Sequence, residues 1–263
     1  MSDDVNFDAY KPAEIARRVQ AAGVEKVRLA FLPLLTLAVL AGAFIAMGAA
    51  FYTLTVTGNV LGFGVGRLVG GVAFSLGLIL VVIGGAELFT GNNLIVMAYA
   101  DGKVTLAQML RNWGIVYLGN FIGALGTVAL MVLSGTLFLA GGEVGITARG
   151  IAEAKLALPV DEAFFRGILC NTLVCLAVWL SYASQRVTGK ILGIVFPITA
   201  FVAAGFEHSV ANMYLIPVGF AAGVPLDLGG LALNLAAVTL GNIGGGGVLV
   251  GLVYWLVYLR PAR

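Results

Sequence analysis

Six long apolar segments follow one another along this chain, and they restrict the folds it can adopt. They lie at about 29–54, 68–100, 112–140, 163–184, 191–222 and 228–259. A helix needs about 20 residues to cross the hydrocarbon layer of a membrane. Because 60% of the 263 residues are hydrophobic and only 11% are charged, a water-soluble fold is excluded. The sequence therefore predicts an all-α membrane protein with six transmembrane helices in one domain, residues 28–260.

The N-terminal residues 1–27 have a different character. Apolar side chains recur there at roughly helical spacing between charged ones, at Ala13, Ile15, Ala16, Val19 and Ala22. This pattern is typical of an amphipathic helix that lies outside the bilayer. The segment lacks the apolar core of a cleavable signal peptide. We therefore expect residues 1–27 to form a separate N-terminal helix on the cytoplasmic side.

The basic residues predict the orientation in the membrane. With six spans, both ends of the chain lie on the same side, and that side carries Lys11, Arg17, Arg18, Lys26, Arg28, Lys103, Arg111, Arg186, Lys190, Arg260 and Arg263. The opposite side carries only Arg67, Arg149, Lys155 and Arg166. An excess of lysine and arginine marks the cytoplasmic side. Both termini are therefore predicted to be cytoplasmic.

The chain contains an internal repeat. "GAELFTGNNLI" (85–95) aligns with "GFEHSVANMYLI" (205–216), and "NWGIVYLGNFIG" (112–123) aligns with "NLAAVTLGNIGG" (234–245). Each half has three spans, an odd number, so the second half must be inverted relative to the first. Inverted repeats with paired discontinuous helices are a transporter architecture. We expect two inverted three-helix repeats, with the second and fifth spans interrupted near Leu88–Asn92 and His208–Asn212.

His208 is the only histidine of the chain. The repeat places it opposite the Leu88–Thr90 region, so its ring could meet the Thr90 hydroxyl near the middle of the membrane. Ionisable groups inside a membrane are costly and usually functional. The alternative is a buried histidine with a purely structural role, whose ring is held by one hydrogen bond. A single histidine excludes a haem with two axial histidines and a multi-histidine metal site, so no cofactor or metal is expected.

Several other polar residues interrupt the apolar segments. Glu87 and Glu207 are expected to cap backbone amides that the broken helices release, with proton transfer as the alternative. Asparagines inside the membrane most often join helices by hydrogen bonds, at Asn92, Asn120, Asn212 and Asn242. Asn171 is expected at the site itself, because it interrupts an otherwise apolar fourth span. Lys155, in a predicted loop 141–162, is either a solvated charge or an attractor of anions.

Large apolar side chains flank the predicted polar pair, and most would simply pack the core. They could also form narrow apolar constrictions, which are a gating device in channels. These residues are Phe74, Leu78, Leu88, Phe89, Val174 and Phe201. The glycine run "GNIGGGG" (241–247) is expected to let helices approach closely.

Five motifs together resemble the formate/nitrite transporter family from about residue 10 onward. They are "GGAELFTGNN", "QMLRNWGIVYLGNFIGAL", "FRGILCNTLVCLAVWLSYAS", "FVAAGFEHSVANMYLIP" and "LGNIGGGGVLVGLVYWLVYLR". Within the family the chain is most similar to the formate channels. The resemblance implies an aquaporin-like six-helix fold and a homopentamer in the bacterial inner membrane, with lipid around it. Each subunit would have a pore for small monovalent anions.

The resemblance also implies roles for individual residues. Thr90 and His208 would form the central pair, with Asn171 nearby, and Lys155 would be the vestibule lysine. Glu207 and Asn212, on either side of His208 in the sequence, are also predicted to lie along the substrate pathway. The constrictions would be formed by Phe74, Leu78, Leu88, Val174 and Phe201. Gly91 and the short loop "GFAAGVPLDLGG" (219–230) depart from the formate channels, which leaves nitrite open beside formate.

Other classes of protein fit the sequence less well. A water channel is expected to show paired Asn-Pro-Ala motifs, an ammonium channel twin pore histidines, and a retinal protein a lysine in its last span. An enzyme would need a nucleophile–base pair or a set of metal ligands, which one histidine does not supply. We therefore expect an anion transporter for formate, with nitrite or hydrosulfide as alternatives, that is not an enzyme and does not bind nucleic acid.

Overall fold

The computed structural model describes residues 9–260, and all named elements in this range are helices. Residues 1–8 of the predicted N-terminal helix, and Arg263, lie outside the described residues. Six helices are long and apolar enough to cross a membrane, namely α2 (Phe31–Val56), α3 (Phe63–Gly84), α6 (Leu106–Leu133), α8 (Val160–Ala183), α9 (Val187–Ala204) and the continuous helix Leu228–Tyr258. The chain is a multi-pass membrane protein, and the six predicted spans are confirmed.

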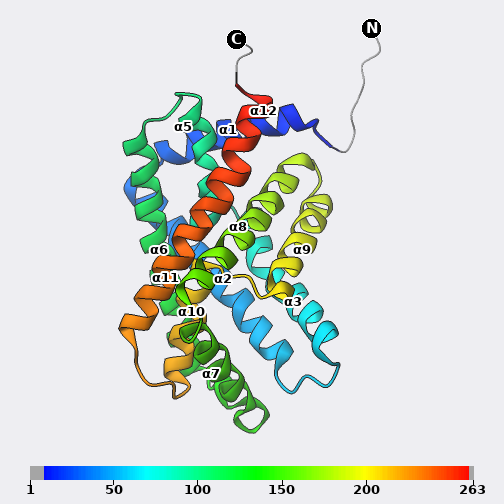
Figure 1. Cartoon of the computed structure of the whole chain (residues 1–263), viewed down its shortest axis with the longest axis vertical. Helices are drawn as coiled ribbons and strands as arrows, with labels where there is room; N and C mark the ends of the chain where they lie inside the picture. The colour runs from blue at the N-terminus through cyan, green and yellow to red at the C-terminus, as the bar shows by residue number, and fades with distance from the viewer. Residues whose placement is uncertain (1–8, 261–263) are drawn as a thin grey trace.

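Two shorter helices lie at opposite ends of the long axis of the molecule (Figure 1). One is α1 (Pro12–Arg28), which lies at the same end as α12 (Val253–Tyr258). The other is α7 (Glu143–Leu156). The expectation of a loop over 141–162 is wrong, because most of it is α7, with Glu143 in its first turn and Lys155 in its last. Both charges suit the dipole of the helix.

α1 is packed against the bundle rather than set apart from it. Its apolar residues Ile15, Ala16 and Val19 are buried in one cluster with Leu94 and Trp179 of the transmembrane part. This burial removes the apolar stripe of α1 from water, which is a main source of stability for an amphipathic helix. The described part of the predicted N-terminal segment therefore shares a hydrophobic core with the membrane helices.

Two of the spanning helices stop inside the bundle. α3 ends at Gly84, and after residues 85–88 the chain is helical again in α4 (Phe89–Asn92), η1 (Asn93–Ile95) and α5 (Val96–Ala100). α9 ends at Ala204, and after residues 205–208 the chain continues as α10 (Ser209–Ala221). The first linking residues, Gly85 and Gly205, have φ angles of 76° and 74°, a left-handed conformation that suits glycine. The interruptions overlap the predicted ranges only at Leu88 and His208, and the rest of those ranges is helical.

The last span contains a long π-helical section. It comprises α11 (Leu228–Ile243), the π-helix η3 (Gly244–Leu252) and α12, while the remaining element η2 (Thr136–Gly142) links α6 to α7. A Cβ atom at Gly245 would lie 2.1 Å from the carbonyl oxygen of Ile168 in α8, and one at Gly241 would lie 2.2 Å from that of Phe164. The prediction that this glycine run lets helices approach closely is confirmed.

Candidate functional site

Asparagines of α6 and α11 hold the two helix breaks. The backbone N–H of Phe89 donates to Asn120 Oδ1 at 2.9 Å, and that of Ser209 donates to Asn242 Oδ1 at 2.9 Å. Each asparagine also donates its amide hydrogens to two carbonyl oxygens, those of Ala38 and Glu87 for Asn120 and those of Gly167 and Glu207 for Asn242. One released N–H group and one released carbonyl oxygen at each break are therefore satisfied by an asparagine, and the amides of Glu87 and Glu207 donate to the backbone carbonyls of Leu37 and Arg166. The expectation that glutamate carboxylates would cap these amides is wrong.

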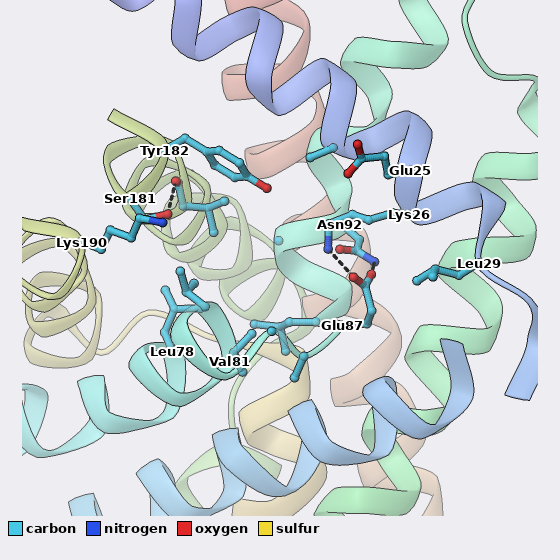
Figure 2. Close-up of a pocket in the computed structure, with 17 residues that line it drawn as sticks. Glu25, Lys26, Leu29, Leu78, Val81, Glu87, Asn92, Ser181, Tyr182 and Lys190 are labelled. Atoms are coloured by element: carbon cyan, nitrogen blue, oxygen red, sulfur yellow. Dashed lines mark hydrogen bonds and ion pairs between the residues drawn. The ribbon is translucent and has the colours of Figure 1, made fainter. Parts of the chain in front are cut away.

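The carboxylate of Glu87 belongs to a separate polar cluster. It accepts hydrogen bonds from Lys26 Nζ at 2.6 Å and from Asn92 Nδ2 at 2.7 Å. Asn92 Nδ2 also donates to Asn112 Oδ1 at 3.0 Å, and Asn112 Nδ2 donates to the carbonyl oxygen of Lys26 at 3.2 Å. Figure 2 shows Lys26 and Asn92 on either side of the Glu87 carboxylate. These four hydrogen bonds form a closed ring, which connects α1 to the helix break after α3 and to α6.

Glu207 forms the matching cluster in the second half. Both of its carboxylate oxygens accept from Lys155 Nζ at 2.9 Å, and Asn212 Nδ2 donates to Oε2 at 2.6 Å. Asn212 also donates to Asn234 Oδ1 at 2.8 Å, and Asn234 Nδ2 donates to the carbonyl oxygen of Lys155 at 3.0 Å. Lys155 is therefore held in place and is not a freely solvated charge.

The two clusters join corresponding residues in the same order, and Lys155 makes one bond more than Lys26 does because it contacts both oxygens of its glutamate. Lys26 of α1 takes the place that Lys155 of α7 has in the other cluster. Lys26 precedes Ala38 by the same number of residues as Lys155 precedes Gly167. The structure is needed to recognise this register, because it matches Ala38 with Gly167 through their bonds to Asn120 and Asn242, whereas the sequence alone presents Lys26 as a flanking charge. α1 is therefore the counterpart, in the first half of the chain, of α7 in the second half. The predicted domain boundary after residue 27 lies next to Lys26, which bonds to Glu87 in the transmembrane part.

A cavity adjoins each cluster. The Lys26 cavity, of about 390 Å³, is lined by Lys26 and Glu87 and by the apolar residues Leu78 and Leu88. The Lys155 cavity, of about 220 Å³, is lined by Lys155, Glu207, Arg67, Asn212 and His208, and by the apolar residues Phe74 and Phe201. The rings of Phe74 and Phe201 meet edge to face, with centroids 5.5 Å apart. Four of the six predicted constriction residues thus line the two cavities, two in each.

Thr90 and His208 form a buried polar pair, and His208 lines the Lys155 cavity. Thr90 is 0% exposed and His208 3% exposed, and Thr90 Oγ1 lies 2.9 Å from His208 Nε2. His208 is the N-cap residue of α10, and its Nδ1 atom accepts a hydrogen bond from the backbone N–H of Ala211 at 3.0 Å. An atom that accepts has a free lone pair, so the proton of the neutral ring is on Nε2. The ring therefore directs an N–H group at Thr90.

Three further predicted residues line neither cavity. Asn171 Nδ2 faces three acceptors, at 2.8 Å from Asn93 Oδ1 and from the Asn242 carbonyl, and at 3.2 Å from the Thr90 carbonyl. Phe89 packs edge to face against Tyr117 and Trp113 of α6, and Val174 is buried with 1% exposure. Asn171 thus holds the backbone of Thr90, and Phe89 points toward α6. Among residues 9–260, no group of three or more His, Cys, Asp or Glu side chains could hold a metal ion.

Six spanning helices, a cavity at each of two lysine–glutamate clusters and a buried polar pair define a membrane channel or transporter. The family model described as "Formate/nitrite transporter" matches residues 13–256. The formate channel FocA of Escherichia coli strain K12 is 44% identical over 280 aligned residues, which cover 99% of this chain and 98% of FocA. The chain belongs to the formate/nitrite transporter family.

Two solved structures have the same fold. One is described as a pentameric formate channel with formate bound. It is 40% identical, has a TM-score of 0.81, and the match covers 88% of this chain and 98% of that one. The other is described as an FNT family ion channel. It is 33% identical, has a TM-score of 0.85, and the match covers 94% of this chain and 99% of that one. The predicted family and the all-helical fold with six membrane helices are confirmed.

Proposed function

We propose that this protein conducts small monovalent anions, formate first among them, through a pore that joins the Lys26 cavity to the Lys155 cavity. The observation that carries the proposal is the buried Thr90–His208 pair, which lies among apolar side chains that line the two cavities. A pathway of this kind would offer an anion one strong hydrogen-bond donor at its narrowest part. The 44% identity to a formate channel supports formate, and nitrite or hydrosulfide remain the alternative anions.

The free energy of dehydration explains why a donor is needed there. A bare carboxylate in an apolar constriction would cost tens of kcal/mol by a Born estimate. The carboxyl pKa of formic acid is about 4, so the solute is mostly anionic at pH 7. The N–H group of His208 would replace lost water as the anion passes Phe74 and Phe201 on one side and Leu78 and Leu88 on the other. Lys26 and Lys155 would attract the anion to the two mouths.

We further propose that the protein is a homopentamer in a bacterial inner membrane, with both termini in the cytoplasm. The likeness to a pentameric channel supports the assembly. The excess of lysine and arginine on one side supports the orientation. The position of α1 and α12 at one end of the molecule agrees with it (Figure 1). In this orientation the Lys26 cavity faces the cytoplasm and the Lys155 cavity faces outward, and the protein transports without catalysing a reaction.

Uptake into proteoliposomes tests this proposal. Formate, nitrite and hydrosulfide would be compared side by side at two pH values, with protein-free vesicles as the control. Formate flux that depends on the protein is the expected result. If none of the three anions is carried, the proposal is refuted. If only nitrite or hydrosulfide is carried, that anion takes the place of formate as the proposed substrate. A native mass other than that of a pentamer in mild detergent would contradict the proposed assembly.

A further inference from the structure

We infer that Arg67 forms an anion-binding subsite at the mouth of the Lys155 cavity, which takes up planar two-oxygen anions such as formate before they reach His208. The inference rests on the proposed function and adds to it a residue that the sequence motifs do not single out. Arg67 belongs to the first turns of α3, and its partly buried side chain lines the same cavity as His208 and Lys155.

Three basic side chains line this cavity, and Arg67 differs from the other two. Lys155 contacts Glu207, and Arg166 Nη2 contacts Glu162 Oε2 at 2.6 Å. Arg67 has no carboxylate within ion-pair distance among the described residues. Its Nε–H group donates to the carbonyl oxygen of Ala203 at 2.9 Å, and this bond orients the guanidinium. Its two terminal nitrogens are left without a hydrogen-bond partner in the described part of the chain.

The helix break at Gly205 makes room for this guanidinium. A Cβ atom at position 205 would lie 2.6 Å from Arg67 Nη2, so a side chain there would displace it. Gly85, the corresponding residue of the other break, would place a Cβ atom in open space. The space beside Gly205 is thus occupied by a charged group in one half of the molecule only. The Lys26 cavity has no arginine in its lining.

The charges around the two cavities differ accordingly. Arg67, Lys155 and Arg166 line the Lys155 cavity, where Glu207 compensates Lys155 and Glu162, outside the lining, compensates Arg166, so that the charge of Arg67 is left in excess. In the Lys26 cavity, two lysines, Lys26 and Lys190, face two carboxylates, Glu25 and Glu87. A cleft with an excess of one sign of charge concentrates the opposite ion. The Lys155 cavity should therefore gather anions more strongly than the Lys26 cavity does.

The guanidinium also sets a geometric preference. Its paired N–H groups match the two oxygens of a carboxylate, whereas the lysine ammonium acts as a point charge. Formate and nitrite each present two oxygens in a plane, and hydrosulfide presents one sulfur atom. Arg67 should therefore favour formate and nitrite over hydrosulfide in the first binding step, before His208 acts on any of them.

Uptake kinetics of Arg67→Gln and Arg67→Lys test the inference. Proteoliposomes would be sorted by an N-terminal tag so that the Lys155 cavity faces outward. For Arg67→Gln we expect the half-saturating formate concentration to rise threefold to tenfold with little change in maximal rate. The rise should shrink at high ionic strength, because salt screens the charge. Compared with Arg67→Gln, Arg67→Lys restores the charge but not the paired N–H groups. It should therefore bring hydrosulfide uptake back to the wild-type level and formate uptake back only in part. Arg149→Gln is the matched control, since Arg149 contacts Glu153 on α7 and lines neither cavity.

Three results would overturn the inference. An unchanged half-saturating concentration in Arg67→Gln, with a lowered melting temperature, would make Arg67 only a support for the end of α9. An effect seen only in vesicles of anionic lipid would assign Arg67 to lipid headgroups. An equal effect in Arg149→Gln would reduce it to general surface charge. Failure of the wild-type protein to carry any of the three anions would instead refute the proposed function.

Discussion

The backbone N–H of Ala211 donates a hydrogen bond to Nδ1 of His208, three residues earlier in the chain, at 3.0 Å. The bond forms because His208 caps α10, whose first N–H groups have no partner within the helix. It fixes the tautomer of the neutral ring and leaves Nε2–H to face Thr90. A second proton on Nδ1 would break the bond to Ala211. The geometry thus favours a ring that donates a hydrogen bond to a passing anion over one that shuttles a proton.

This tautomer can be measured directly, because the chain has a single histidine. We expect the ¹⁵N spectrum of labelled protein in lipid at pH 7 to show a protonated Nε2 and an unprotonated Nδ1. Unfolded protein, in which neither nitrogen is constrained, is the control. A doubly protonated ring at pH 7 would contradict the hydrogen bond to Ala211 and would favour proton transfer.

The two lysine–glutamate pairs should differ in their contribution to stability. The side chains of Lys155 and Glu207 are 14% and 7% exposed, and that of Lys26 is 26% exposed. Removing one partner of a buried pair costs about 3 kcal/mol, because a buried charge is left without a partner. We expect Lys155→Met to lower the unfolding temperature in detergent more than Lys26→Met does.

A second variant separates charge from packing in the same pair. Lys155→Met combined with Glu207→Gln removes the uncompensated carboxylate, and an amide can still interact with Asn212. Most of the lost stability should return. If the double variant is as unstable as Lys155→Met alone, the loss comes from packing of the lysine stem, and the ion pair contributes little.

Asn120 offers a test of how the helix breaks are held. Its side chain accepts from the N–H of Phe89 and donates to two carbonyl oxygens. Asn120→Asp keeps the shape and the acceptor but places a carboxylate oxygen against two carbonyls. Leaving buried groups unsatisfied costs about 1–3 kcal/mol each, so we expect little folded protein by size-exclusion chromatography. Normal yield of Asn120→Asp would show that the break is held by other contacts.

Gly245 should tolerate no side chain, whereas another glycine in a spanning helix should. A Cβ atom at Gly245 would lie 2.1 Å from a backbone oxygen, and one at Gly126 of α6 would have nothing within 4 Å. Gly245→Ala must push α8 and η3 apart, so we expect a loss of about 1–3 kcal/mol in stability. Gly126→Ala should be neutral or slightly stabilising, because alanine favours a helix. Equal melting temperatures for the two variants would refute the close packing at Gly245.

Spans and polar pairs could be predicted because they depend on patterns along the chain. Hydrophobic length indicated the six helices, and the repeat was enough to place the ring of His208 near Thr90. Directions of single side chains could not be predicted in this way. Phe89 follows Leu88 directly, yet it packs on α6 while Leu88 lines a cavity, because Leu88 has an extended backbone and Phe89 begins α4.

The charges were harder to interpret for a different reason. Lys26 lies before the first apolar segment and Arg67 between the first two, so both resemble the basic flanks of ordinary membrane helices. Only the fold reveals that Lys26 reaches Glu87 and that Arg67 enters the cavity of His208. The asparagines that cap the breaks could not be recognised from the sequence, because Asn120 and Asn242 lie more than 30 residues after the amides that they accept from.

The most direct test of the pathway is His208→Phe. Phenylalanine keeps a flat ring that can stack on Phe201, as His208 does at a centroid distance of 6.0 Å, but it has no donor for an anion. A pore without that donor offers no compensation for lost water, so we expect formate uptake per folded oligomer to fall by at least tenfold. Thr90→Val is the companion variant, because it keeps the N–H group and removes only its partner, and its flux should fall less. If the role of His208 is purely structural, the reverse pattern is expected, with lower stability and unchanged flux per oligomer. Oligomers of His208→Phe that carry formate at the wild-type rate would therefore assign His208 to packing alone.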